Sequence, residues 1–363
     1  MGGTVRPLVE ITVGELGPSI LRARPEQMVG SKSRMQGKVM SEQRTTTDDV
    51  GIDACKAWLD VNIQPANTAF RVPNTKKGHK QILTALKDFS VRIVVIEATG
   101  KHHRSAHRFL HEAGVPVAIV NPLRARLFAE PMGALAKTDR VAARMLALWG
   151  GMGALKAPPP LPESLENLRE IVRNRDATVA AKVALQNQLG TTILACVRKQ
   201  INAQIKTAAR AAGALEREAV RMIEADPALA RRLEILVSIP GVGALTAIAL
   251  LANMPELGSL DAKQAGMLAG LAPVACDSGQ RNGPRHIRGG RKQVRTGLYM
   301  AAMSAARYNP HLQRFHDRLI DAGKLAKVAL TAVMRKLLVL ANALLKEDRC
   351  WSIQAPIAKP LPA

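Results

Sequence analysis

The sequence predicts an α/β domain near the N-terminus, followed by a long helical arm and a mainly α-helical C-terminal domain. Three observations predict this order. Between residues 49 and 156, apolar runs typical of strands alternate with segments of helical spacing. A proline-rich segment, residues 157–163, then interrupts any helix. From residue 164 onward, helical periodicity dominates.

Composition indicates a partner that carries negative charge. The 363 residues are enough for two domains, and 52 Lys and Arg against 29 Asp and Glu give a net charge of +23. Nucleic acid is the first candidate, and a membrane surface is the alternative. The apolar runs are short and broken by charges, and none approaches the ~20 residues of a spanning helix. We therefore expect no membrane partner.

Cysteine usage and the N-terminus point to the cytoplasm. The four cysteines are scattered, without the close pairs of zinc sites or redox motifs: Cys55, Cys196, Cys276 and Cys350. The first residues lack the apolar core of a signal peptide, so no export is predicted. Aromatic residues make up only 3% of the chain, so stacking of bases on an aromatic platform is not the expected mode of binding.

The α/β domain is predicted element by element over residues 49–156. Residues 50–63 alternate like a strand pair, and residues 91–100 and 115–122 read as buried strands. Helical spacing marks three further segments, at residues 79–89, 103–114 and 137–149. Residues 1–48 show no sustained period and are predicted to be a loose extension.

The arm occupies residues 157–232. Its apolar residues recur at roughly heptad intervals from Leu165 to Val197, interrupted by Arg175, Lys182 and Gln186. One interpretation is a coiled coil that pairs protomers, and the other is a helix packed on its own domain.

The C-terminal domain is predicted over residues 233–347, with a tail at 348–363. Residues 296–308 and 327–345 read as helices that supply a second core. Residues 238–247, SIPGVGALTA, resemble the turn of helix-hairpin-helix modules, in which backbone amides meet a DNA phosphate. The alternative is a tight turn that needs Gly241 and Gly243 for backbone freedom.

Three acids are candidates for a metal site. Asp53 lies in a strand-like segment, Glu97 closes a buried strand, and Asp139 begins a helix. Oxygen ligands of this kind suit a hard divalent cation that serves phosphoryl transfer, with Mg²⁺ as the expected cofactor. Each acid taken singly is also explained as a solvated residue at an element's end.

The second candidate site is Ser278 with the basic segment, defined as residues 277–295. A serine that attacks phosphorus needs nearby cations to hold the phosphate, and this segment has six: Arg281, Arg285, Arg288, Arg291, Lys292 and Arg295. In isolation, the serine is explained as a turn residue and the cations as a solvated face. Tyr299 is a competing nucleophile, for which packing on a helix face is the better interpretation.

The motifs together resemble the transposases of the insertion-sequence 110 family. The resemblance runs in the same order from about residue 50 to 347, and the last two motifs are highly specific. Its motifs are GIDAC, VVIEATG, NPLRARLFAE, AKTDRVAARMLA, IPGVGALTA, LAGLAPVACDSGQRNGPRHIRGGRKQVRTGLYMAA and GKLAKVALTAVMRKLLVLANALL.

This resemblance implies a RuvC-like, RNase H type domain joined through the helical arm to a C-terminal transposase domain. It implies a DNA recombinase that excises and inserts its element, guided in members of the family by a bridge RNA. Asp53, Glu97 and Asp139 fall on three of the four acids that hold Mg²⁺, and Ser278 falls on the serine that links to DNA. A homo-oligomer, dimer or tetramer, is implied. Nucleic-acid contacts are assigned to Lys137 of the K-T-D motif, to Gly241 and Gly243, and to the six cations.

One position departs from the family pattern. The fourth acid is expected three residues after Asp139, on the same helical face, and the chain has Ala142 there. A decayed copy, an engineered variant, or a site that recruits water or another acid would each explain the change. Two other functions therefore remain as hypotheses: a nucleic-acid-binding protein without catalysis, and a nuclease that uses the acids alone.

Overall fold

The computed structural model describes residues 47–133, 138–153, 155–279, 283 and 285–353. The predicted extension, residues 1–48, lies outside the described residues except for its last two. Lys137 and Arg281 lie outside them as well, as does most of the predicted tail.

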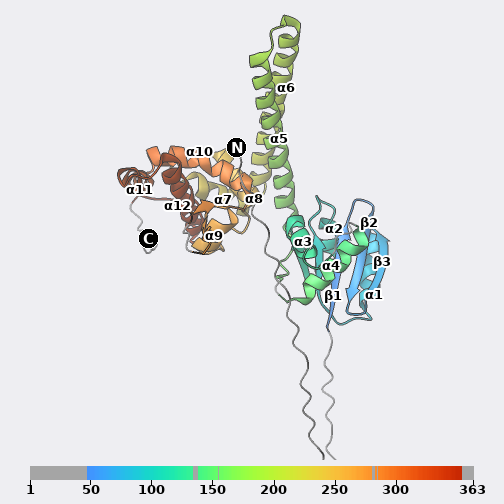
Figure 1. Cartoon of the computed structure of the whole chain (residues 1–363). Coiled ribbons are helices and arrows are strands. Elements are labelled where there is room, and N and C mark those ends of the chain that lie inside the picture. Colours follow the sequence, from blue (N-terminus) through green and yellow to red (C-terminus); the bar gives the residue numbers. More distant parts are fainter. Residues whose placement is uncertain (1–46, 134–137, 154, 280–282, 284, 354–363) are drawn as a thin grey trace, which may run out of the picture. The chain divides into compact units, whose positions relative to one another are not determined.

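A five-stranded mixed sheet forms the centre of the N-terminal domain (Figure 1). Its spatial order is β3-β2-β1-β4-β5, with β1, β2 and β3 antiparallel and with β4 and β5 parallel to β1. The strands are β1 (Asp48–Ala54), β2 (Trp58–Gln64), β3 (Thr68–Pro73), β4 (Val91–Glu97) and β5 (Val117–Val120). The predicted strand pair and both later strands are confirmed, and β3 is an additional strand. An antiparallel meander followed by parallel strands fits the expected RNase H-like domain.

Helices cover both faces of this sheet. On one face, α1 (Lys76–Leu86) and α2 (Arg104–Glu112) pack on Val50 and Ile52 of β1. On the other, α3 (Pro122–Ala129) and α4 (Asp139–Gly151) pack on Ile93 and Val95 of β4. Because side chains alternate along a strand, Gly51 and Asp53 of β1 face α4 rather than α1.

Gly51 allows α4 to lie directly on β1. A Cβ at this position would come within 1.9 Å of the Ala143 carbonyl oxygen and 2.4 Å of the Ala147 nitrogen. No side chain fits in that space, since the contacts are with backbone atoms. The close approach fixes the position of α4 on the sheet.

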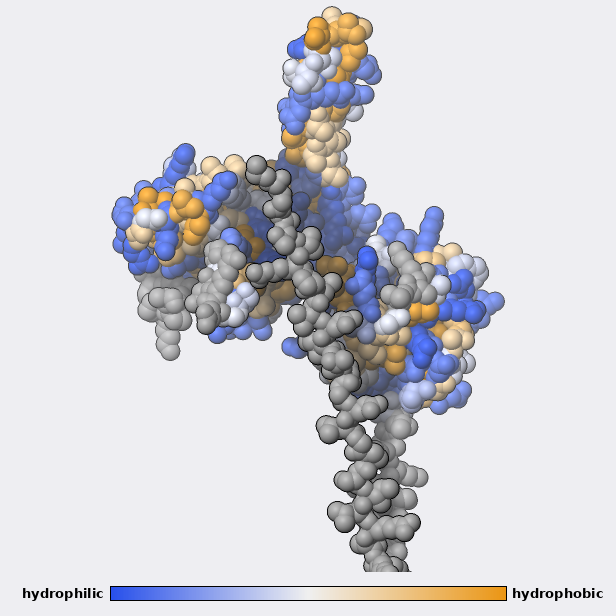
Figure 2. Space-filling model, in the orientation of Figure 1, coloured by the Kyte–Doolittle hydropathy of each residue, from blue (hydrophilic) through white to orange (hydrophobic). Residues whose placement is uncertain are grey.

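The arm is a hairpin of two long helices. α5 (Glu163–Thr191) and α6 (Ala195–Glu224) pack along each other and are joined by residues 192–194. At its base, Leu168 and Ile223 belong to the core of the C-terminal domain. At its tip, Ile193 and Leu194 are exposed, where Figure 2 shows an apolar cap. The apolar residues at the base of the arm are thus explained by packing on the C-terminal domain. Pairing of protomers through the exposed tip stays a prediction.

The C-terminal domain is mainly α-helical, as predicted. Its helices enclose one apolar core, to which Trp351 of the predicted tail also packs. The elements are α7 (Pro227–Val237), α8 (Ala244–Asn253), α9 (Ala262–Leu268), β6 (Pro273–Val274), β7 (His286–Ile287), α10 (Lys292–Tyr308), α11 (Pro310–Asp321) and α12 (Ala326–Lys346).

α12 corrects the expectation that no apolar run reaches the length of a spanning helix. It has 21 residues and a mean hydropathy of 1.8 over its most apolar window. Half of that window is buried inside the protein, and Val333, Leu337 and Leu338 belong to the core. A core helix of this kind passes the same test of length and composition as a membrane span.

Candidate active site

Asp53, Glu97 and Asp139 line one pocket of about 590 Å³, called the acid pocket below. Asp53 lies near the end of β1, Glu97 is the last residue of β4, and Asp139 is the first residue of α4. The sequence predicts these acids in three separate elements, and the fold brings the three elements to one place.

The fold explains why they meet. β1 and β4 are neighbouring parallel strands, with Ile52 opposite Ile96, so their carboxyl ends lie at the same edge of the sheet. α4 begins there because the Thr138 side chain caps it, accepting a hydrogen bond from the Val141 amide at 3.3 Å. The free amides and the dipole at this helix start favour a carboxylate such as that of Asp139.

The acids repel one another. The pKa of Asp53 is raised from 3.8 to about 6, first by partial burial and then by the negative charges of Glu97, Asp139 and Asp60. Strongly perturbed carboxyls in a pocket are typical of functional sites. A bound cation would reduce the repulsion among these carboxylates.

The three acids have the right chemistry for a hard divalent cation, but their side chains are too far apart to hold one in their present positions. All three side chains offer carboxylate oxygens, the ligands that Mg²⁺ and similar ions prefer. Among the described residues, no three Asp, Glu, His or Cys side chains lie close enough together to hold an ion as they stand. Binding would therefore require the carboxylates to turn further into the pocket.

Ala142 lines the same pocket, one helical turn beyond Asp139. A carboxylate at this position would stand in the pocket that the other acids line. The pocket contains one further acid, Glu130 after α3, whose carboxylate accepts a hydrogen bond from Arg126 at 2.8 Å.

Sequence reasoning missed two residues beside the acids, Asp60 and Arg71. Asp60 of β2 lies directly opposite Asp53, and Arg71 of β3 lies opposite Asp60. The Arg71 guanidinium donates to both carboxylate oxygens of Asp60 and to Asp139. The alternation in residues 50–63 could have paired Asp60 with Asp53, whereas Arg71 lies on the strand that the sequence did not reveal.

Ser278 is exposed in the connection between β6 and β7. The preceding Asp277 accepts a hydrogen bond from the Gly283 amide at 3.2 Å, and Gly279 has φ of +54°. Ser278 lies between these two residues, and its side chain is exposed to solvent. Its hydroxyl is therefore accessible to a large substrate.

The described cations of the basic segment, at residues 285–295, divide into two groups. Arg291 makes two 2.7 Å hydrogen bonds to the Glu256 carboxylate, and Arg295 donates to the Gly289 carbonyl at 2.7 Å. Arg291 thereby holds the segment against Glu256, whereas Arg295 bonds within the segment and also donates to the Ala269 carbonyl after α9 at 3.4 Å. Arg285, Arg288 and Lys292 are exposed. For those three, nucleic-acid contact stays a prediction.

The two glycines of the hairpin-like turn differ in their surroundings. Gly241 has φ of +101°, and a Cβ there would lie 2.5 Å from the Ala305 nitrogen of α10. Gly243 precedes α8, and a Cβ there would meet nothing within 4 Å. Packing against α10 alone explains why residue 241 is a glycine. At Gly243 there is open space before the start of α8, where a phosphate could approach the helix amides.

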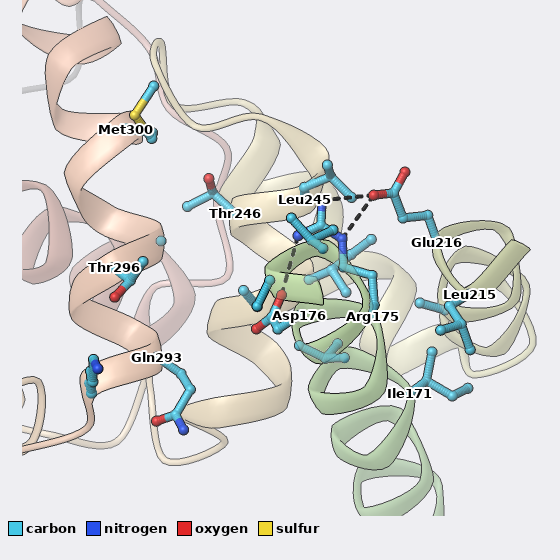
Figure 3. A pocket seen from close by; sticks show the side chains of 18 residues that line it. Ile171, Arg175, Asp176, Leu215, Glu216, Leu245, Thr246, Gln293, Thr296 and Met300 are labelled. Carbon is cyan, nitrogen blue, oxygen red and sulfur yellow. Dashed lines mark hydrogen bonds and ion pairs between the residues drawn. The ribbon is translucent and has the colours of Figure 1, made fainter. Parts of the chain in front are cut away.

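Two further pockets lie in the C-terminal region. The larger, about 620 Å³, lies between α5, α6, α8 and α10, where Arg175 is bound by Glu216 and Asp176 (Figure 3). Its lining is largely apolar and includes Lys292. The other, about 440 Å³, is lined by Tyr299. Tyr299 is 40% exposed, so it is less packed than the sequence suggested.

Sequence comparisons match both halves of the chain. Residues 37–196 match a family described as "Transposase", and residues 233–317 match "Transposase IS116/IS110/IS902 family". Together the two matches cover more than half of the chain.

Individual relatives agree with these matches. The chain is 28% identical to the "Pilin gene-inverting protein" of Moraxella bovis over 83% of this chain and 96% of that protein. It is 29% identical to "Insertion element IS110 uncharacterized 43.6 kDa protein" of Streptomyces coelicolor, over 41% of this chain and 36% of that protein.

A solved structure of RuvC from T. thermophilus, in complex with a Holliday junction substrate, aligns with 31% of this chain and 99% of that chain. Its sequence identity is 17% and its TM-score is 0.24, a likeness too low to support an argument. The functional conclusion comes from the sequence relatives: the chain belongs to the IS110 family of transposases, enzymes that recombine DNA.

Proposed function

We propose that this transposase cuts and rejoins DNA through Ser278, with a divalent cation, Mg²⁺, held by Asp53, Glu97 and Asp139. The observation that carries the proposal is the convergence of the three acids on one pocket with a raised Asp53 pKa. The role of Ser278 as the nucleophile is supported by its exposure and by the exposed cations of the basic segment.

The proposed covalent step balances without an added reactant. The Ser278 oxygen forms a bond to phosphorus, and the ester bond from phosphorus to a sugar oxygen breaks. That oxygen leaves as a hydroxyl, taking up the proton that the serine loses. One phosphate ester replaces another, so the energy of the broken DNA bond is kept in the serine–phosphate bond. A DNA hydroxyl can later attack that phosphorus and release the serine.

The chain's own residues have separate roles in this proposal. Arg285, Arg288 and Lys292 are exposed and would hold phosphate oxygens near the serine. A cation bound by the three acids would neutralise charge that develops on the phosphate. Arg291 would hold the segment in place through Glu256, and Arg295 through the Ala269 carbonyl outside the segment and the Gly289 carbonyl within it.

The proposal also includes two nucleic-acid partners, DNA and RNA. DNA is the substrate of a transposase. The net charge of +23 also supports a second nucleic acid, and we propose a guide RNA encoded by the element. A homo-oligomer and a cytoplasmic location complete the proposal.

One observation favours a second function, a DNA-binding relative without catalysis. Ala142 stands in the acid pocket where the family pattern has an acid, and loss of a ligand weakens metal binding. Such a protein would bind DNA with a steep salt dependence and leave the strands intact in the presence of Mg²⁺.

A recombination assay separates the two functions. The full chain is combined with DNA bearing the ends of the element, a target, and RNA transcribed from the noncoding sequence that flanks the gene. Joined products that require Mg²⁺ support the transposase. Binding without joined products, under conditions in which Ala142→Asp gives products, supports the inactive relative.

A further inference from the structure

One guanidinium connects the sheet to the start of α4. Arg71 Nε lies 2.9 Å and Nη2 lies 2.8 Å from the two carboxylate oxygens of Asp60. The same Nη2 lies 3.2 Å from Oδ2 of Asp139. Arg71 thereby joins the third strand of the sheet to the first residue of the helix that carries a candidate metal ligand.

Asp60 fixes the guanidinium in place. Its side chain is 4% exposed, and a buried carboxylate requires a partner that neutralises it and fills its hydrogen bonds. The two-point contact also sets the orientation of the planar guanidinium, which a single contact would leave free to rotate. Arg71 is thus a fixed donor rather than a mobile surface cation.

Asp139, by contrast, needs external support. Its side chain is 58% exposed, and it begins a helix at the edge of the pocket. A carboxylate that is held at one oxygen can present its other oxygen to a cation, and such outer hydrogen bonds orient metal ligands. The contact to Oδ2 leaves Oδ1 as the oxygen that can turn into the pocket.

We propose that Arg71, anchored on Asp60, is a positioning residue that orients the Asp139 carboxylate for the metal. This inference rests on the proposed function, since it takes Asp139 to be a metal ligand. Its importance is greater in this chain because Ala142 supplies no second carboxylate on α4. Asp139 is then the one acid that α4 contributes to the pocket. Its orientation decides whether α4 supplies a ligand to the metal.

The test measures Mn²⁺ affinity on the full chain by calorimetry, with Mn²⁺ as a probe of the Mg²⁺ site. Arg71→Gln should weaken binding about ten-fold or more, the usual effect of losing an outer hydrogen bond. Simple electrostatics predicts the opposite sign, because removing a nearby positive charge favours a cation. Arg71→Lys keeps the charge without the two-point geometry and should also weaken binding.

Two further variants control for folding. Arg71→Gln leaves Asp60 buried without its partner, so the double variant Asp60→Asn with Arg71→Gln removes both charges and keeps a folded sheet. Arg92→Gln is the matched control. Arg92 of β4 binds the buried Asp49 of β1 at 2.7 Å, at the end of the strand away from Asp53, and its loss should leave Mn²⁺ affinity unchanged.

The outcomes distinguish this inference from the function on which it rests. If the wild type binds no Mn²⁺, or Asp53→Asn does not weaken binding, the proposed metal site is wrong and the role of Arg71 is wrong with it. If Asp53→Asn abolishes binding while Arg71→Gln and the double variant bind like Arg92→Gln, or more tightly, the positioning role alone is overturned.

Discussion

At the scale of single residues, Asp53 shows how the acid pocket is adapted to hold positive charge. Its carboxyl is partly buried and faces the negative charges of Glu97, Asp139 and Asp60. A fold that keeps acids this close together sacrifices some stability for a binding site. The raised pKa of Asp53 makes this cost measurable.

The stability of the metal-free protein should therefore depend on pH through Asp53. Its pKa is about 6 in the folded chain and 3.8 without the fold, so between these values the folded state binds more protons than the unfolded one. Stability then falls as pH rises through this window and stays lower above it. In chelator, Asp53→Asn should gain about 1 kcal/mol over wild type at pH ~7.5 and nothing at pH ~4, after a discount for solvent screening. Equal differences at both pH values in thermal melts would contradict the raised pKa.

A second residue-scale prediction concerns Ala142. Ala142→Asp adds a carboxylate to the acid pocket one turn from Asp139, which should tighten Mn²⁺ binding and raise recombination by about ten-fold or more. Ala142→Asn has nearly the same shape without the charge and serves as the control. A side-by-side assay in which the two variants perform equally would mean that the missing acid does not limit the site.

At the scale of elements, the position of α4 depends on Gly51. Gly51→Ala would force its methyl group against backbone atoms of Ala143 and Ala147, which can yield only if the helix moves. We expect a loss of about 1–3 kcal/mol in the free energy of unfolding and weaker Mn²⁺ binding, because Asp139 moves with the helix. Gly190→Ala in α5 meets nothing within 4 Å and should be neutral or slightly stabilising. Denaturant melts that rank the two variants equally would contradict this packing.

The hairpin-like turn allows a test that separates folding from DNA contact. Gly241→Ala should destabilise the C-terminal domain by more than 1 kcal/mol, because its backbone is left-handed and lies against Ala305. Gly243→Ala has room and should fold, so any loss of DNA affinity would reflect the open space before α8. If Gly243→Ala binds DNA as wild type does in an anisotropy titration, the DNA interpretation of this turn is wrong.

The elements also show what sequence alone can predict. Sequence predicts Asp53 as a candidate because it lies in a strand-like segment, Glu97 because it closes an apolar strand run, and Asp139 because it begins a periodic helix. Sequence patterns do not reveal β3, since only one of its six residues, Val72, is buried. Arg71 lies on that strand. Its role depends on a register across three strands, which no local pattern contains.

At the scale of the whole molecule, charge and fold point to the same partner. The excess of 23 positive charges suits a polyanion, and both halves of the chain match transposases. The family assignment could be predicted from motif order. The structural use of Arg291 and Arg295 could not, because a basic run in sequence does not reveal which cations the protein itself binds.

The central claim is that Ser278 becomes covalently linked to DNA. The most direct measurement incubates the full chain with labelled DNA bearing the ends of the element, Mg²⁺ and the flanking RNA, and resolves the products on a denaturing gel. We predict a protein–DNA adduct with wild type that is absent with Ser278→Ala, while Ser278→Ala still binds the DNA in a native gel. An adduct that persists with Ser278→Ala would contradict the assignment of the nucleophile and direct attention to another residue, with Tyr299 first among them.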